Sequence, residues 1–320
     1  MALSEFDLIR QYFDRVLKET GNLRQGIGDD AAIISVPDGM ELALSMDTLV
    51  QDVHFHANTR PEDVGYKSLA VNLSDLAAMG AEPRWVTLSL TVPEADQTWL
   101  EQFSQGFFEL ADRIPVILIG GDLNKGPLSV TVQVHGLLPA GLAILRKGAT
   151  PGDLVYVSGH PGEAGLGLRL LKNMIDIPGT YHDKVLERLH RPDPRIALGI
   201  KLRDYAHSAI DISDGLIADL GHMLDASQCG AMINLEALPL SGAFDGINNI
   251  EDAWEIVLTS GDDYELCFTI NEDQKEILEN NSGIDTPLTC IGKIVSKPGL
   301  KLIRSDGTKL NFQGSGYRHF

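Results

Sequence analysis

The chain has 320 residues, and its 43% hydrophobic content is enough to build the cores of two folded domains. Its formal net charge of -19 disfavours binding to nucleic acid or to an anionic membrane, which leaves small molecules and proteins as the expected partners. No run approaches membrane-spanning length and the acidic start does not fit a signal peptide, so the expected location is cytoplasmic.

A helix is predicted over 61–80, because Pro61 suits its first turn and Gly80 its end. Helical spacing places Ser68, Asn72, Asp75 and Met79 on one stripe of an otherwise apolar helix. An amide and a carboxylate on such a helix indicate the wall of a site rather than a solvated face.

Two strands are predicted over 85–92 and 130–135, where apolar and polar residues alternate. Their polar faces suggest pairing across a homodimer. Between them we expect a helix over 99–113 and a buried strand over 114–119 that ends at Gly120-Gly121-Asp122, which would place Asp122 at the carboxyl edge of the sheet.

Proline and glycine between 139 and 151 predict a domain boundary, with domains at 1–140 and 141–320. The second half reads as an α+β pattern like the first, so the expected fold class is α+β with two α/β-sandwich domains. The first would have a mixed or antiparallel sheet, and the second a mixed sheet covered by helices. The second-half elements are predicted as follows: strands 154–158, 208–212, 231–235, 264–270 and 290–295, and helices 195–207, 216–226 and 272–279, besides one after the glycine-rich turn 159–167.

The glycine-rich turn leaves two interpretations open. Gly162-x-x-Gly165-x-Gly167 does not have the spacing of a dinucleotide-binding loop, and the chain has no GxxxxGK[ST] segment. The turn could bring a helix N-terminus to phosphates, or its glycines could allow close helix packing. Cys229, Cys267 and Cys290 form no CxxC pair and fit reduced, buried thiols.

Aspartates recur where apolar segments meet turns, and they predict a site for a hard cation. Mg²⁺ prefers carboxylate, carbonyl and water oxygens and is often shared with substrate phosphates, so the pattern indicates an enzyme that uses a polyphosphate. Aspartates also cap helices and close turns, which is the structural alternative at any one position. The segments concerned are Gly28-Asp29-Asp30, Ser45-Met46-Asp47-Thr48, Asn72-Leu73-Ser74-Asp75, Gly120-Gly121-Asp122 and Asp211-Ile212-Ser213-Asp214-Gly215.

With these segments, the order of motifs from about Glu5 to Phe320 resembles the thiamine-monophosphate kinases of the aminoimidazole-ribotide-synthetase-like ATP-binding superfamily. The resemblance also rests on Val53-His54-Phe55, Gly261-Asp262-Asp263-Tyr264 and the ending Gly316-Tyr317-Arg318-His319-Phe320. The family usually has Gly-Glu-Asp-Tyr where this chain has Asp262, and Val-Glu-Gly-Val-His-Phe where it has 50–55. The shorter acid at 262 changes the reach toward a substrate.

The resemblance implies direct in-line transfer of the ATP γ-phosphoryl group to thiamine monophosphate, giving thiamine diphosphate and ADP. It implies several Mg²⁺ ions, with Asp30, Asp75 and Asp211 sharing metals near the transferred phosphate. The metal ligands implied are Asp30, Ser45, Met46 through its carbonyl, Asp47, Asp75, Asp122, Asp211 and Asp214; no residue beyond these would be catalytic.

The resemblance also implies two sets of substrate contacts. ATP would contact Gly121, Asp122, Arg146 and Ser213, although Ser213 could equally cap the helix that follows it. Thiamine monophosphate would contact His54, Asp262, Asp263, Tyr317 and Phe320. The two terminal aromatic rings could stack on the cationic thiazolium, or could simply fill the core.

Two other functions are weighed against this one. A synthetase of the same superfamily would share the aspartates, but this chain has no cysteine before Cys229 and ends in Phe320, which disfavours the selenophosphate and hydrogenase-maturation members. A non-catalytic metal-binding module is the third hypothesis, and the chain lacks a DxDxDG loop with a distal glutamate.

Overall fold

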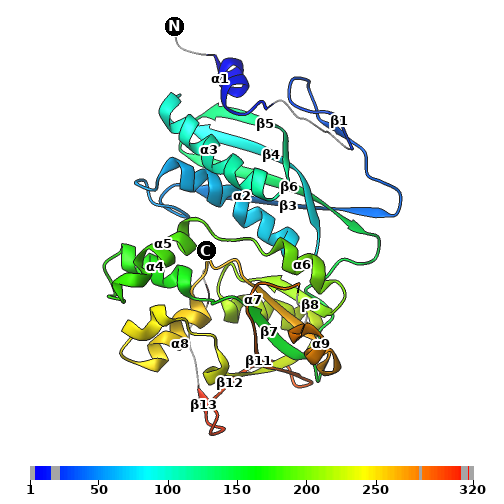
Figure 1. Cartoon of the computed structure of the whole chain (residues 1–320), viewed down its shortest axis with the longest axis vertical. Coiled ribbons are helices and arrows are strands. Elements are labelled where there is room, and N and C mark those ends of the chain that lie inside the picture. Colours follow the sequence, from blue (N-terminus) through cyan, green and yellow to red (C-terminus); the bar gives the residue numbers. More distant parts are fainter. Residues whose placement is uncertain (1–3, 16–21, 281–282, 311–315, 317–320) are drawn as a thin grey trace. The chain divides into compact units, whose positions relative to one another are not determined.

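The computed structural model of the chain describes residues 4–15, 22–280, 283–310 and 316. It divides into two compact units, the first within 1–76 and 81–142 and the second within 77–80 and 143–320. Each unit combines helices with its own sheet, which confirms the predicted α+β class (Figure 1). Among the residues just named, no helix has the length and apolar character needed to cross a membrane.

The first unit is built on a four-stranded mixed sheet. Its β4–β5 pair is parallel and the other pairs are antiparallel. The alternation predicted for 85–92 and 130–135 is confirmed, because the apolar residues of both segments are buried and the polar residues between them are partly exposed. Across the sheet the strands are β3 (Met40–Val50), β6 (Ser129–Pro139), β4 (Glu82–Val92) and β5 (Ile117–Lys125).

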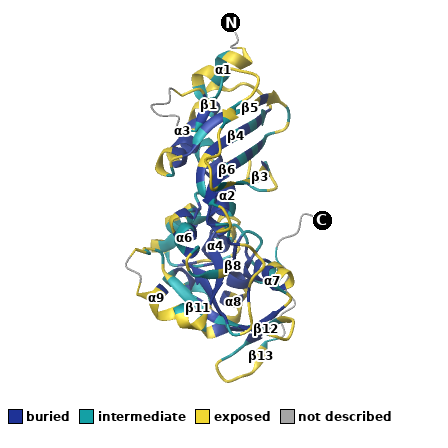
Figure 2. Cartoon of the chain, turned by 90° about the vertical axis from the view of Figure 1, so that its right-hand side faces the viewer, coloured by how far each residue is buried: buried dark blue, intermediate teal, exposed yellow. Residues whose placement is uncertain are grey.

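Two long helices, α2 (Pro61–Ala78) and α3 (Gln97–Arg113), lie side by side on this unit (Figure 1). A Cβ atom added to Gly65 of α2 would lie 2.1 Å from the Phe103 carbonyl oxygen of α3, so glycine is what allows the two backbones to touch. Figure 2 shows the resulting core, with α2 and the middle of the sheet buried. The helix predicted over 61–80 is therefore confirmed with nearly the same bounds.

A small apolar cluster packs strand β1 (Leu23–Gln25) against the opposite side of the first sheet. Trp85 is buried there in a cluster with Leu23, Ile119 and Leu137. The elements that precede the main sheet in the chain are α1 (Glu5–Tyr12) and the two antiparallel strands β1 (Leu23–Gln25) and β2 (Ile33–Ile34).

The second unit has a seven-stranded sheet in which β12 pairs with β9 in parallel and all other pairs are antiparallel. The helix predicted over 195–207 ends five residues early, because the chain enters β8 at Ala206. In sheet order the strands are β13 (Lys309–Leu310), β12 (Gly299–Ile303), β9 (Gly230–Asn234), β11 (Leu288–Val295), β7 (Leu154–Ser158), β10 (Leu266–Ile270) and β8 (Ala206–Asp211).

The helices of the second unit pack on this sheet through one large apolar core that includes Val157, Leu220 and Trp254. Cys229 and Cys267 are buried in the same core as free thiols, as predicted. The helices are α4 (Glu163–Leu171), α5 (His182–His190), α6 (Ile196–Leu202), α7 (Leu216–Ser227), α8 (Ile250–Thr259) and α9 (Lys275–Glu279).

Candidate active site

In the first unit, helix α2 fixes the part of β3 that carries Ser45 and Asp47. The Asn72 side chain accepts a hydrogen bond from the Asp47 backbone N–H at 2.8 Å. The Ser45 hydroxyl donates to the Asp75 carboxylate at 2.5 Å. The stripe predicted from helical spacing thus places Asn72 and Asp75 next to the same strand. The Asp75 carboxylate, the Ser45 hydroxyl and Asp47 are thereby held close together along β3.

Asp122 lies inside β5, which corrects the prediction that the strand stops before it. In the parallel β4–β5 register Asp122 is opposite Ser89. The strand was expected to end at these glycines, but Gly121 has a φ of 154° and a Cβ atom there would lie 1.8 Å from the Leu88 carbonyl oxygen. Glycine is needed because β4 approaches closely, not because the strand ends. The Asp122 side chain is exposed and accepts a hydrogen bond from Asn124.

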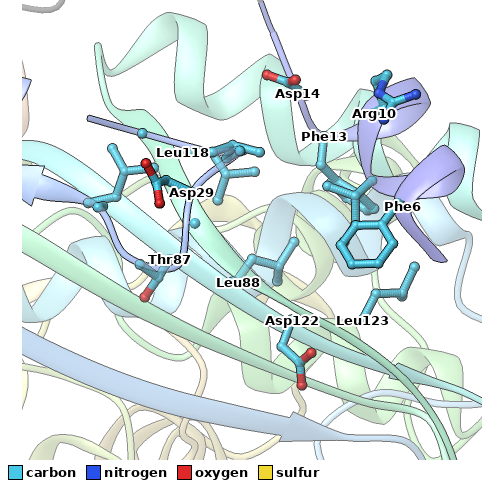
Figure 3. Close-up of a pocket in the computed structure, with 18 of the residues that line it drawn as sticks. Phe6, Arg10, Phe13, Asp14, Asp29, Thr87, Leu88, Leu118, Asp122 and Leu123 are labelled. Atoms are coloured by element: carbon cyan, nitrogen blue, oxygen red, sulfur yellow. The ribbon is translucent and has the colours of Figure 1, made fainter. Parts of the chain in front are cut away.

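Asp30 and Asp122 both line a hollow of about 660 Å³ in the first unit. The Asp30 backbone N–H donates to Asp29 at 2.9 Å, and both acids are exposed. Figure 3 shows the rings of Phe6 and Phe13 at one side of this hollow and Asp29 at the other. The hollow therefore combines carboxylate oxygens with an apolar wall.

His54 follows β3 in a tight turn. Its ring Nδ1 accepts from the Val50 backbone N–H at 3.0 Å, and its own backbone N–H donates to the Val50 carbonyl at 2.9 Å. Because Nδ1 is the acceptor, the neutral ring carries its proton on Nε2. A neutral His54 can therefore act as a hydrogen-bond donor through Nε2.

In the second unit, Asp211 is the last residue of β8, and the turn that follows carries Ser213 and Asp214. The Ile212 backbone N–H donates to the Glu265 carbonyl at 2.8 Å, and the Ser213 carbonyl accepts from the Asp262 N–H at 2.9 Å. Asp211 is buried, whereas Asp214 is partly exposed. This ladder brings the predicted metal-binding segment and the predicted substrate-binding segment next to each other.

Ser213 does not cap the helix that follows it, contrary to the structural alternative. Helix α7 begins after Gly215, and the backbone N–H groups of 213, 214 and 215 all donate to Asp219 instead. Burial raises the pKa of the Asp219 carboxyl to about 7, against the opposing effect of these amide donors. Sequence reasoning missed Asp219, although an acid in the first turn of a helix is a recognisable signal.

Asp262 and Asp263 have different surroundings. The Asp263 carboxylate is buried and accepts from the backbone N–H groups of Gly162 at 2.6 Å and Ala164 at 3.2 Å, at the start of α4. Burial raises the pKa of Asp263 well above its usual range. Asp262 is partly exposed and accepts from the Tyr264 hydroxyl at 3.1 Å. Asp262 is therefore the more accessible of the two carboxylates.

The same contacts bear on the glycine-rich turn. The N–H groups of Gly162 and Ala164 already bind a carboxylate of the chain, and a Cβ atom at Gly167 would lie 2.2 Å from the Val185 carbonyl oxygen. The close-packing interpretation of this turn is the one that fits.

Three predicted substrate contacts remain: Arg146, Tyr317 and Phe320. Arg146 is exposed, and its carbonyl accepts from the Ser227 hydroxyl at 3.3 Å. Tyr317 and Phe320 lie outside the described residues.

The donors fit a hard cation in type, because they are carboxylate, hydroxyl and carbonyl oxygens. Within the described ranges, no three Asp, Glu, His or Cys side chains form a group that could hold a metal by themselves. Mg²⁺ commonly takes one or two carboxylates together with substrate phosphates and water. The oxygen donors described above fit that kind of site.

Comparisons with known proteins agree with the motifs. Residues 28–138 match the AIR synthase related protein N-terminal domain, and residues 150–305 match the corresponding C-terminal domain. The thiamine-monophosphate kinase of Escherichia coli (strain K12) is 48% identical over 100% of this chain and 99% of its own length.

Solved structures give the same relationship. Thiamine-monophosphate kinase from Stenotrophomonas maltophilia K279a superposes with a TM-score of 0.85 at 43% identity, covering 91% of this chain and 93% of that one. AaThiL complexed with AMPPCP and TMP superposes with a TM-score of 0.78 at 31% identity, covering 89% of each chain. The chain belongs to the thiamine-monophosphate kinase family, within the AIR synthase related proteins.

Proposed function

We propose that the protein transfers the γ-phosphoryl group of ATP to thiamine monophosphate in an Mg²⁺-dependent reaction that yields thiamine diphosphate and ADP. The full-length relationship to thiamine-monophosphate kinases is the observation that carries this proposal. A relative of this family, AaThiL, has been solved with AMPPCP and TMP, a pair that corresponds to the two substrates proposed here.

The acceptor needs little help as a nucleophile. A phosphate monoester has a second pKa of about 6 and is already largely dianionic at neutral pH, so no strong general base is required for direct in-line attack. The main barrier is the repulsion between two polyanions. Bound Mg²⁺ would supply the charge neutralisation that this transfer needs.

The residues proposed to hold Mg²⁺ offer only oxygen atoms. Their carboxylates would orient the cations, while Ser45 and the Met46 carbonyl would complete the ligand sets. Because Ser45 donates to Asp75 and Asn72 holds the Asp47 backbone, these ligands are set in place by α2. The acids proposed are Asp30, Asp47, Asp75 and Asp122 in the first unit and Asp211 and Asp214 in the second.

Each unit would also bind part of a substrate. Gly121 and Asp122 of the first unit would contact ATP, as would Arg146 and Ser213 of the second; the guanidinium of Arg146 suits phosphate oxygens. For thiamine monophosphate we propose His54, Asp262, Tyr317 and Phe320, with Asp263 in a supporting role at the start of α4. The predicted cytoplasmic location stays a prediction.

We further propose a homodimer formed through the first unit. Leu44 and Met46 of β3 are more than half exposed, and they are paired with His135 and Gln133 of β6 on the same face of the sheet. Both ring nitrogens of His135 are buried and have no hydrogen-bond partner within the described part of the chain. A second copy would cover this face; a monomeric mass at micromolar concentration would contradict the dimer.

The activity is tested by incubating the protein with ATP, Mg²⁺ and thiamine monophosphate and separating the thiamine species and the nucleotides. We expect thiamine diphosphate and ADP in equal amounts. Unphosphorylated thiamine is the matched control acceptor, since it lacks the attacking phosphate. Release of ADP without thiamine diphosphate would show an ATPase instead, and no turnover would favour a non-catalytic metal-binding module.

A further inference from the structure

Asp219 occupies an unusual position beside the acidic turn of the second unit. Its side chain is buried at 3% exposure, and its Oδ2 atom accepts three backbone hydrogen bonds, from Ser213 at 3.0 Å, Asp214 at 3.0 Å and Gly215 at 3.1 Å. Successive N–H groups that converge on one point form an anion-binding nest, which in other loops often receives a phosphate. Here the anion is a carboxylate of the chain itself.

The other side of the turn is held by a different segment. The Ile212 carbonyl accepts from the Tyr264 N–H at 2.8 Å, and the Ser213 carbonyl accepts from the Asp262 N–H at 2.9 Å. The carbonyl groups of the turn are thus fixed by 262–264, whereas three of its amide groups are fixed by Asp219 alone. Removing that carboxylate would leave three neighbouring N–H groups without the acceptor that orients them.

Gly215 makes the turn still more dependent on this arrangement. Its φ is 117°, and a Cβ atom there would lie 2.8 Å from the Thr259 carbonyl carbon. No side-chain cap is present at Gly215, and the three amides that lead into α7 are bound by Asp219 from within the first turn of the helix.

We propose that Asp219 is a positioning residue for divalent-cation binding: by gathering the three amides, it fixes the backbone of 213–215, from which the Asp214 carboxylate extends close to Asp211 at the end of β8. The inference rests on the proposed function, because it takes these two acids as cation ligands. Asp219 itself touches neither substrate nor metal. Because Asp219 holds the turn in one conformation, the cation binds to ligands that are already in place. The turn then loses less conformational freedom when the cation binds.

The test uses the full chain and Mn²⁺ as a probe for the divalent cation. Free Mn²⁺ is measured by electron paramagnetic resonance during a titration in the presence of AMPPCP, which is not hydrolysed in the assay. For Asp219→Ala we expect a loss of about 10- to 100-fold in Mn²⁺ affinity, the range found when groups that orient metal ligands are removed. Asp219→Asn keeps the shape and one acceptor oxygen, so it should recover part of the affinity.

Asp225→Ala is the matched control, because Asp225 is an exposed acid on the same helix. Asp225→Ala removes one negative charge from the same helix without touching the three amides, and this variant should bind Mn²⁺ like the wild type. Circular dichroism and thermal unfolding confirm that each variant is folded. If Asp219→Ala does not fold, the affinity of Asp219→Asn decides the matter, and it must lie clearly below that of Asp225→Ala.

Folded Asp219 variants with wild-type Mn²⁺ affinity would overturn the inference, even if they were less stable, since a purely structural residue would behave in that way. The proposed function fails separately. If the wild type forms no thiamine diphosphate, the proposed function is wrong; if it does, and Asp214→Asn loses Mn²⁺ affinity while the Asp219 variants keep it, only the role of Asp219 is wrong.

Discussion

The acids of the two units differ in exposure and in what they contact. In the first unit Asp30, Asp47 and Asp122 are exposed, at a hollow or along a strand. In the second unit Asp219 and Asp263 are buried, and their carboxylates accept hydrogen bonds from backbone amides. The same residue type thus serves two purposes: these exposed acids can exchange water for a cation, whereas Asp219 and Asp263 fix the backbone around a site.

The largest expected effect concerns the proposed ligands themselves. Asp75→Asn or Asp211→Asn should abolish formation of thiamine diphosphate while the protein stays folded, because each removes a carboxylate that would hold the Mg²⁺ needed to neutralise the phosphates. Steady-state turnover and circular dichroism check this prediction. Near-normal kcat for either variant at saturating Mg²⁺ would mean that the acid is not a ligand.

A large effect on stability is expected at a buried ion pair of the second unit. Arg195 donates to both carboxylate oxygens of Glu265, and both side chains are at most 9% exposed. Arg195→Met leaves the buried Glu265 charge unpaired and should lower the free energy of unfolding by about 3–5 kcal/mol.

The matched comparison for this variant is Asp122→Asn in the first unit. Because Asp122 is exposed, its replacement should change the free energy of unfolding by no more than about 0.5 kcal/mol. Denaturant unfolding of both variants measures the contrast between the units. Equal losses of stability would remove the distinction between exposed and buried acids.

A smaller, pH-dependent effect is expected at Glu163. Burial by itself would raise the pKa of this carboxyl, but hydrogen bonding and the charges of Lys184 and Arg188 outweigh burial, so the pKa lies below its ordinary value of 4.5. A lowered pKa in the folded state stabilises the protein above the unfolded pKa, and this stabilisation is lost as pH falls through the folded value.

Glu163→Gln should therefore be less stable than the wild type at neutral pH, and the difference should shrink as the pH falls below 4.5. Urea unfolding across that pH range checks the trend. Glu187→Gln is the control, since Glu187 is exposed on α5. A stability difference for Glu163→Gln that does not change with pH would indicate a packing effect.

The smallest expected effect separates the two substrates. Tyr317→Ala should raise KM for thiamine monophosphate about fivefold, through the loss of about 1 kcal/mol of stacking and cation–π attraction, and leave KM for ATP nearly unchanged. Arg146→Ala should do the reverse. Equal effects of Tyr317→Ala on both KM values would make the C-terminal ring a structural plug.

Elements with a strong period could be predicted from the sequence alone. The strands 85–92 and 130–135 form nearly as expected because apolar and polar residues alternate along them, and the helix 61–80 does so because Pro61 and Gly80 mark its ends. Very short strands without a clear alternation of apolar and polar residues could not be predicted in this way. Strands β1, β2 and β13 have only two or three residues each, and tertiary packing decides whether such segments pair.

Within the candidate site, the residue types were easier to predict than their surroundings. The spacing of Asn72 and Asp75 predicted a shared stripe, and the structure joins both to β3. The glycines before Asp122 predict the end of a strand, because the close approach of Leu88 from another strand is not visible in a single segment. For the same reason, the burial of Asp263 against α4 could not be foreseen from its position next to Asp262.

The central claim is that the acids proposed as ligands bind the cations that phosphoryl transfer needs, while acids such as Glu163 and Asp263, whose carboxylates are already bonded within the chain, shape the protein. Electron paramagnetic resonance of Mn²⁺ bound per chain, with AMPPCP and thiamine monophosphate present, tests it most directly in the wild type, Asp47→Asn, Asp122→Asn and Glu163→Gln. We predict that the wild type and Glu163→Gln bind the same number of ions and that the two exposed-acid variants bind fewer. Exposed-acid variants that keep every ion bound by the wild type would contradict this account.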